Sequence, residues 1–190
     1  KITLVQDIIG TEVWWPAMGV FSLQTLVPGR AYKIRVEESL SLTFPACDNF
    51  KAAPKMPQQI SQSTTPWGEL IRTPGSHTIA IPGSAISGLN SGDCLGAFDV
   101  HGNLFGFMEI ENSNENSVMM LYGDDPTTTI KDGFYENEAI TFIMLEKATG
   151  NEIPLDVTFD DSMPNAEQIF NNQGLSAITG STLSGFQTLT

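Results

Sequence analysis

The acidic stretch LYGDDPTTTIKDGFYENEAI, residues 121–140, is the part of the sequence that is richest in side chains able to bind a cation. Asp124, Asp125 and Asp132 lie within nine residues, with three threonines between them. Calcium takes about six to eight oxygen ligands from carboxylates, carbonyls and water, so these aspartates predict a Ca²⁺ site. Their spacing departs from the Asp-x-Asp-x-Asp-Gly order of an EF-hand. The alternative is that the aspartates accept backbone N–H groups within their own turns.

Four aromatic side chains are candidates for ligand binding: Trp14, Trp67, Tyr122 and Tyr135. Sugar-binding sites present aromatic faces to pyranose rings, because these rings provide contact area at low entropic cost. Trp14 and Trp15 are adjacent, so on a strand one would be buried and the other exposed. Trp67 lies in a proline-rich stretch, where the alternative is that it packs the loop onto the fold. Tyr122 and Tyr135 flank the acidic stretch and could join its aspartates in one site.

Catalytic residues are not predicted. The chain has two histidines, His77 and His101, and Cys94 with His101 would occupy opposite ends of a hairpin strand. Glu109 and Glu111 lie on one strand face, whereas a glycosidase pair must flank the scissile bond from opposite sides. The sequence has no Gly-x-Ser-x-Gly elbow, zinc cluster or nucleotide-binding fingerprint. We therefore expect a protein that is not an enzyme.

Two cysteines, Cys47 and Cys94, are a candidate disulfide. A bridge that closes a loop of this length would stabilise the fold by about 3 to 4 kcal/mol in the loop-entropy description. The alternative is two buried free thiols.

The charge of the chain is unevenly distributed. Residues 1–72 hold seven Lys and Arg against six Asp and Glu, whereas residues 73–190 hold two against sixteen. Such an acidic surface repels phosphate backbones and anionic headgroups, which argues against nucleic acid and membrane surfaces as partners. The partners that remain possible are cations, polysaccharides or surface glycans, and basic or neighbouring protein domains. No apolar run is long enough to insert into a membrane.

Alternating apolar residues, separated by Gly, Asn, Asp and Pro turns, predict an all-β fold with antiparallel neighbours. We expect a β-sandwich of the jelly-roll or immunoglobulin-like type, or two small β units packed together. Helical character is expected at 84–87 and 165–170 alone. The strands are predicted at 2–9, 13–15, 31–36, 40–44, 78–82, 94–98, 104–110, 117–122, 139–145 and 154–159, with a last strand after Gly174.

Proline spacing and charge divide the chain into three parts. Residues 46–73 contain three prolines, many Gln and Ser residues, and no strand period, so they predict a linker or a long loop. On either side we expect a small N-terminal β unit at 1–45 and a larger acidic sandwich at 74–190.

Most of the chain resembles a recurring β module found in Bacteroidota, in multidomain surface proteins that are exported by type IX secretion. VWWPAMGVFSLQTLVPGRAYKIRVEESLSLTF at 13–44 is similar to its first half, and GDCLGAFDVHGNLFGFMEI at 92–110, YGDDPTTTIKDGF at 122–134 and ATGNEIPL at 148–155 to its second. The module usually begins with a Trp-Asn-x-Ile-Ser-like strand, which implies that this chain begins late or is truncated. It also has a polar residue where Cys94 stands, which implies an added disulfide.

The resemblance implies an exported accessory module at the cell surface, in proteins that carry adhesive or sugar-degrading domains. Together with the residues above, it predicts a non-catalytic module that binds carbohydrate or another surface ligand. The alternative is a structural module that docks or spaces neighbouring protein domains. Exposed aromatic residues that line a groove would favour the first, and a broad apolar patch would favour the second.

Overall fold

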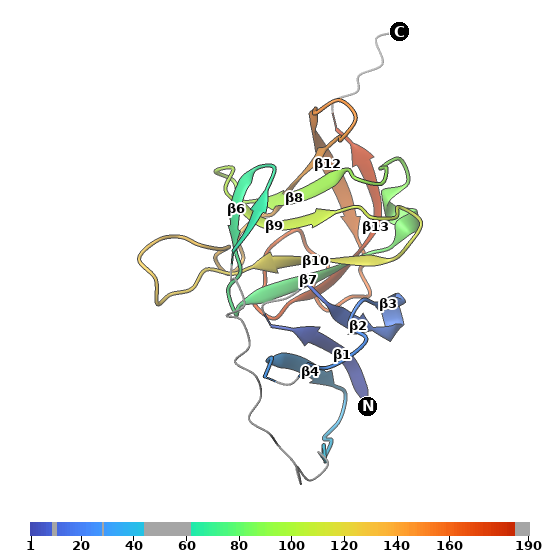
Figure 1. Ribbon diagram of the computed structural model, residues 1–190, viewed down its shortest axis with the longest axis vertical. Coiled ribbons are helices and arrows are strands. Elements are labelled where there is room, and N and C mark those ends of the chain that lie inside the picture. The colour runs from blue at the N-terminus through green and yellow to red at the C-terminus, as the bar shows by residue number, and fades with distance from the viewer. Residues whose placement is uncertain (9–10, 28, 44–61, 185–190) are drawn as a thin grey trace. The chain divides into compact units, whose positions relative to one another are not determined.

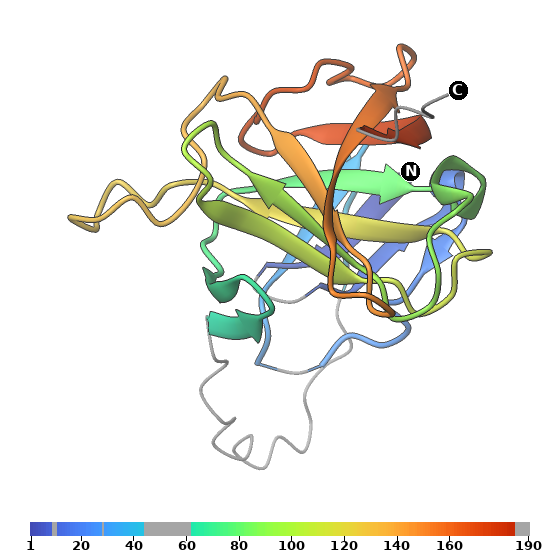
Figure 2. The same ribbon diagram turned by 90° about the horizontal axis from the view of Figure 1, so that it is seen from above.

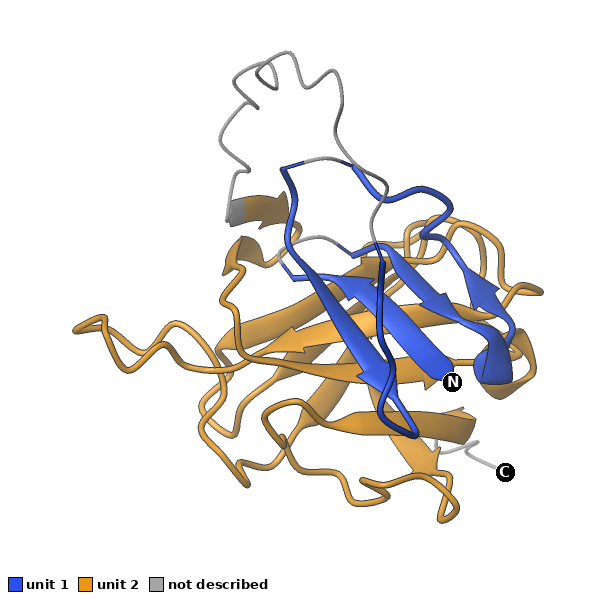
Figure 3. Cartoon of the chain, turned by 90° about the horizontal axis from the view of Figure 1, so that it is seen from below, with its two compact units in different colours: residues 1–60 blue, residues 61–190 orange. Residues whose placement is uncertain are grey.

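The alternating stretches of the sequence form strands in both of the compact units into which the chain divides. The computed structural model describes residues 1–8, 11–27, 29–43 and 62–184. Its two units are residues 1–60 and 61–190 (Figure 3). We refer to them as unit 1 and unit 2.

Unit 1 contains a four-stranded antiparallel sheet in the order β3-β2-β1-β4. Its strands are β1 (Ile2–Asp7), β2 (Val13–Trp15), β3 (Val20–Phe21) and β4 (Tyr32–Val36). The 3-10 turn η1 (Pro16–Met18) links β2 to β3: Pro16 presets its first dihedral angle, and Gly19 ends it with φ 63°, a conformation that favours glycine.

Unit 2 is a closed barrel of seven strands in the order β10-β7-β13-β12-β11-β8-β9, in which β9 returns to β10 (Figures 1 and 2). The strands are β7 (Ser76–Ile81), β8 (Cys94–Phe98), β9 (Leu104–Glu109), β10 (Ser117–Tyr122), β11 (Thr141–Leu145), β12 (Glu152–Phe159) and β13 (Leu175–Leu183). A separate hairpin, β5 (Gln62–Thr65) with β6 (Gly68–Ile71), precedes the barrel, and the 3-10 turn η2 (Gly83–Ile86) follows β7.

The core of unit 2 is built from alternate residues of the barrel strands. Each strand contributes at least one buried apolar side chain to a single cluster, including Ile79, Leu95, Phe105, Met119, Phe142, Leu155 and Ile178. Because side chains alternate across a strand, these residues fill the barrel interior. Loop residues Ile110, Phe134, Ile140 and Phe170 complete the same cluster.

The all-β prediction is confirmed, but the predicted β-sandwich is wrong. A local alternating pattern shows that a strand has one buried face, and it does not show whether the sheet stays open or closes. Closure depends on the parallel pairing of β7 with β13, in which Thr78 lies beside Leu175. No short-range pattern specifies a pairing between residues so far apart in sequence.

Most predicted strands are confirmed, three of them (13–15, 94–98 and 117–122) with the same bounds. The predicted helix at 165–170 is wrong, because the backbone there pairs with residues 138–140. Residues 40–43 form no strand, whereas 62–71, inside the predicted linker, form the β5–β6 hairpin. None of the described helices could cross a membrane.

Candidate functional site

The acidic stretch after β10 forms a loop that projects from the barrel (Figure 2). The Asp124 N–H donates to the Phe134 carbonyl at 2.8 Å, and the Phe134 N–H donates to the Tyr122 carbonyl at 2.9 Å, so the two ends of the loop meet. Carboxylates continue this pairing: the Asp132 N–H donates to Asp124 Oδ1 at 3.0 Å and the Asp125 N–H to Asp132 Oδ1 at 2.8 Å. The loop therefore has its conformation fixed by its own aspartates.

Asp132 and Asp125 accept further hydrogen bonds from the threonines of the loop. The second oxygen of Asp132 accepts the Thr128 hydroxyl at 3.1 Å, and Asp125 Oδ1 accepts both the N–H and the hydroxyl of Thr127. The bonds from Thr127 also lower the pKa of Asp125. Within the described ranges of the chain, no three His, Cys, Asp or Glu side chains form a group that could hold a metal ion. Turn capping accounts for the bonds of all three aspartates.

We expect EDTA to leave the melting temperature of the protein unchanged, because N–H and O–H groups of the loop already satisfy its carboxylates. Scanning calorimetry with EDTA and with added CaCl₂ measures this. A rise in melting temperature with CaCl₂ that Asp124→Ala removes would establish a calcium site and contradict the expectation.

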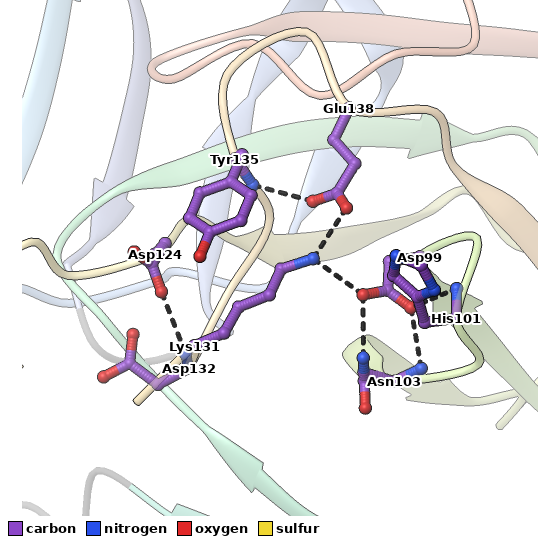
Figure 4. Close-up of polar contacts among 8 residues, drawn as sticks. All are labelled: Asp99, His101, Asn103, Asp124, Lys131, Asp132, Tyr135 and Glu138. Carbon is purple, nitrogen blue, oxygen red and sulfur yellow. Dashed lines mark hydrogen bonds and ion pairs between the residues drawn. The ribbon is translucent and has the colours of Figure 1, made fainter. Parts of the chain in front are cut away.

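Beside the loop, Lys131 joins two carboxylates from different parts of the barrel (Figure 4). Its Nζ lies 2.7 Å from Asp99 Oδ2, in the turn after β8, and 2.6 Å from Glu138 Oε1, before β11. The rings of Phe105 and Tyr135 lie 5.2 Å and 4.7 Å from the same Nζ. An ammonium near two aromatic rings gains cation–π attraction in addition to its ion pairs. We refer to Asp99, Lys131 and Glu138 as the Lys131 network.

The Asp99 carboxylate is buried yet ionised. Burial by itself raises its pKa, but hydrogen bonds from the Asn103 amide, Lys131 and the backbone N–H groups of Asn103 and His101 outweigh this, and the pKa is well below its usual range. Burial lowers the pKa of Lys131, and the two carboxylates more than offset this, so it is raised. Both groups therefore stay charged at neutral pH.

The Lys131 network was not predicted from the sequence. Its local signal is that Lys131 is one of two Lys and Arg residues in positions 73–190 and lies inside the acidic stretch. A lone cation among carboxylates favours an ion pair. Its partner Asp99 is 32 residues away, and only the adjacency of the two loops at one barrel end identifies it.

The four predicted ligand-binding aromatics do not come together. Tyr122 is buried in β10, and Tyr135 is exposed beside Lys131. Trp67, in the β5–β6 turn, packs edge-on against Phe98 at 5.4 Å between ring centroids and against Phe107 at 6.3 Å. Its indole N–H donates to Glu152 Oε1 at 2.8 Å. Trp67 therefore holds the hairpin on the outer surface of β8 and β9, which is the packing role considered as the alternative.

Trp14 belongs to a row of apolar side chains that runs across the whole unit 1 sheet. The register pairs Trp14 with Phe21 on β3 and with Val5 on β1, and Val5 with Ile34 on β4. Paired residues of an antiparallel sheet project from the same face. Phe21 is 54% exposed and Ile34 38% exposed, while Trp14 and Val5 are half-buried. We refer to these four residues as the unit 1 row.

On the opposite face of the same sheet, side chains of β1, β2 and β3 are buried, whereas Arg35 on β4 is exposed. The buried side chains are Leu4, Gln6, Val13, Trp15 and Val20. Trp15 is thus buried while Trp14 lies on the other face, as the spacing predicts.

His77 is fully buried in β7 and is held as a neutral imidazole. Its Nδ1 accepts the Asn171 N–H at 3.2 Å, and its Nε2 lies 2.6 Å from Ser176 Oγ. The Ser176 hydroxyl donates to the Asn165 carbonyl, so the Nε2 proton must point to Ser176. Burial lowers the pKa of His77 to about 4. The ring ties residues 165–171 to β7 and β13.

We expect the free energy of unfolding to fall by about 2 kcal/mol between pH 7 and pH 5, because the unfolded chain protonates His77 near its ordinary pKa while the folded chain does so near 4. This stability is complete above the unfolded pKa and is lost as the pH falls toward the folded pKa. Urea unfolding at the two pH values measures the change. His77→Gln should reduce the difference, and His101→Gln should not. An equal difference in His77→Gln would assign the effect to other groups.

The other potentially reactive side chains, Cys94, His101 and Glu109, do not form a catalytic group. Cys94 begins β8 and His101 lies in the turn beyond its other end. Burial, Glu109 and Asp93 raise the pKa of the Cys94 thiol, which disfavours the thiolate. Glu109 lies 3.9 Å from the ammonium of Lys147, so it is part of a surface ion pair. Cys94 is a buried free thiol, and Cys47, its predicted disulfide partner, lies outside the described residues.

The resemblance to the Bacteroidota module stays a prediction from residues 13–44 and 92–155. A scan against protein-family models and searches of curated proteins and solved structures found no match to this chain.

Proposed function

We propose that the protein is a non-catalytic binding module that docks a protein partner through the unit 1 row. The observation that carries the proposal is that four apolar side chains, from all four strands of one sheet, lie in one row whose ends are exposed. A soluble protein rarely leaves apolar residues contiguous at its surface unless something covers them. The exported, cell-surface setting that the resemblance implies is part of the proposal.

The composition of the row supports a protein as the partner. Protein interfaces are enriched in aromatic side chains at their centre and depleted in charge. In the row, Trp14 and Phe21 are adjacent aromatics and Val5 and Ile34 extend them with aliphatic surface. Val36 and Leu40, which follow Ile34 along the chain, are also exposed. An apolar row of this kind supports a docking module over a groove that binds one sugar chain.

The positions of the reactive side chains support the non-catalytic part of the proposal. An active site needs a nucleophile or acid and base within hydrogen-bond reach of each other and of the substrate. His77 and Ser176 are within reach of each other, but both are fully buried. Their hydrogen bonds to Asn171 and Asn165 use the acceptor and donor capacity that catalysis would require.

Glycan binding is a second candidate, and the pairing of Trp14 with Phe21 favours it. Two neighbouring aromatic rings on a sheet face provide a platform on which a pyranose ring could stack. The two candidates use the same residues, so one set of variants tests both.

The test is to tag the protein in the cells that make it and to compare wild type, the double variant Phe21→Ser/Ile34→Ser, and the control Leu26→Ser. Leu26 is also exposed in unit 1 but lies outside the row. We expect one protein to co-purify with wild type and with Leu26→Ser, and its recovery to fall about tenfold with the double variant.

A glycan array probed with the same three proteins supplies the other readout. Loss of a glycan signal in the double variant, without loss of a protein, would favour the second candidate. Equal behaviour of all three proteins in both assays would contradict a binding role for the row.

A further inference from the structure

Among the described residues of unit 2, the exposed large hydrophobic side chains belong to the two loops that Lys131 joins. These side chains are Val100, Ile130 and Tyr135, which are 65%, 62% and 53% exposed. Val100 follows Asp99, Ile130 precedes Lys131, and the Tyr135 ring lies 4.7 Å from Lys131 Nζ. Val100 and Ile130 are thus chain neighbours of the Lys131 network, and Tyr135 contacts it directly (Figure 4).

We propose that these two loops dock a basic segment of a partner protein, in which Lys or Arg alternates with apolar residues. We refer to Val100, Ile130 and Tyr135, together with the Lys131 network, as the loop end. The proposal concerns a surface of unit 2 and does not depend on the unit 1 row.

The loop end is pre-organised for binding. Asp124, Asp125 and Asp132 fix the loop that carries Ile130, through bonds of 2.8 to 3.0 Å to its backbone. Lys131 ties this loop to the turn that carries Val100, and the Tyr135 N–H donates to Glu138 at 2.8 Å. Side chains that are already held in place lose little entropy when a partner binds.

The charge of unit 2 indicates which partner fits. Residues 61–190 hold three Lys and Arg against seventeen Asp and Glu, and Lys131 and Lys147 both lie in ion pairs. Its field attracts cations and repels nucleic acid, anionic lipid and a second acidic unit of the same chain. The Lys or Arg side chains of the proposed partner would be attracted by the acidic field, and its apolar residues would cover the exposed side chains of the loop end.

Tyr135 supports the basic character of the partner. Lys131 lies over its ring at 4.7 Å, yet half of the side chain is exposed. A guanidinium or ammonium from a partner could therefore contact the exposed part of the same ring by cation–π attraction. Glu136, exposed next to it, adds a carboxylate at the rim.

The test uses fluorescence anisotropy of the full chain with three labelled peptides of equal length, which alternate leucine with lysine, glutamine or glutamate. We expect the lysine peptide to bind at least about tenfold more tightly than the glutamine peptide, the glutamate peptide not to bind, and added NaCl to weaken binding. The double variant Val100→Ser/Ile130→Ser should weaken binding of the lysine peptide about tenfold. The control Leu42→Ser changes a leucine of unit 1 that is also exposed. It should bind like wild type.

Three results would overturn the proposal. Equal binding by wild type and the double variant, with salt dependence retained, would mean that the acidic surface as a whole attracts the peptide. Weaker binding by Leu42→Ser alone would assign the contact to unit 1, and preference for the glutamine peptide would exclude a basic partner. None of these results bears on the unit 1 row, whose variants are tested separately. Melting temperatures equal to wild type confirm that the exposed substitutions leave the fold intact.

Discussion

Replacing Lys131 with methionine is expected to lower the free energy of unfolding by about 3 kcal/mol, since loss of one partner leaves a buried charge uncompensated. The Asp99 side chain is fully buried, and the Glu138 side chain is partly buried, with 13% of it exposed. Methionine keeps the length of the side chain but leaves these two carboxylates without the ammonium between them. The magnitude is at the low end for buried pairs because Lys131 itself is 20% exposed. Urea unfolding at pH 7 measures it.

Lys147→Met is the matched control for Lys131→Met. Lys147 pairs with Glu109 at 3.9 Å, and both side chains are mostly exposed. Surface pairs of this kind contribute about 0 to 1 kcal/mol, so the control should lie close to wild type. Equal losses in the two variants would show that the Lys131 network is an ordinary surface contact and would remove the argument for a fixed loop end.

Replacing Gly133 with alanine is expected to lower the free energy of unfolding by about 3 kcal/mol or more, through overpacking against backbone. A Cβ on Gly133 would lie 2.5 Å from the Asp124 nitrogen, and closer still to the carbonyl carbon and oxygen of Gly123. These atoms belong to the backbone at the end of β10, so no side-chain rotation relieves the clash. The base of the loop would have to open, and Phe134 would leave its stacked position at 5.5 Å from Phe170.

Gly180→Ala on β13 is the matched control for Gly133→Ala. A Cβ there would meet no atom within 4 Å. We expect its unfolding curve to coincide with that of wild type, within about 0.5 kcal/mol. Wild-type stability of Gly133→Ala would contradict this account. It would mean that the base of the loop can accommodate a Cβ despite the close approach of Gly123 and Gly133.

The strands could be predicted from the sequence because their signal is local. Alternation in 154–159 shows which residues share a face, and Gly and Asn mark the turns between strands. The barrel could not be predicted, since it depends on the parallel pairing of Thr78 with Leu175, which lie far apart in the sequence. The false helix at 165–170 has the same origin, because a Pro-Asn start signal resembles a helix N-terminus whether or not a distant strand pairs with the segment.

The candidate sites also differ in whether local sequence or distant pairing determines them. The aspartates of the projecting loop were found from sequence, because their bonds lie within nine residues of one another. Trp14 was found from its type, but its neighbours Phe21 and Ile34 follow from strand register. The Lys131 network joins loops after β8 and β10, and Tyr122 is buried on the face of β10 opposite Met119 and Leu121, which lie in the barrel core. Residue type identifies candidates, and only tertiary pairing decides which of them meet.

A photoreactive residue at the unit 1 row tests the central claim most directly. The protein is produced in its own cells with p-benzoylphenylalanine at Phe21, and a second protein carries it at Leu26, equally exposed outside the row. On irradiation we predict a covalent adduct with one protein from Phe21 and none from Leu26. Adducts of equal yield from both positions, or none from Phe21, would contradict a docking role for the row.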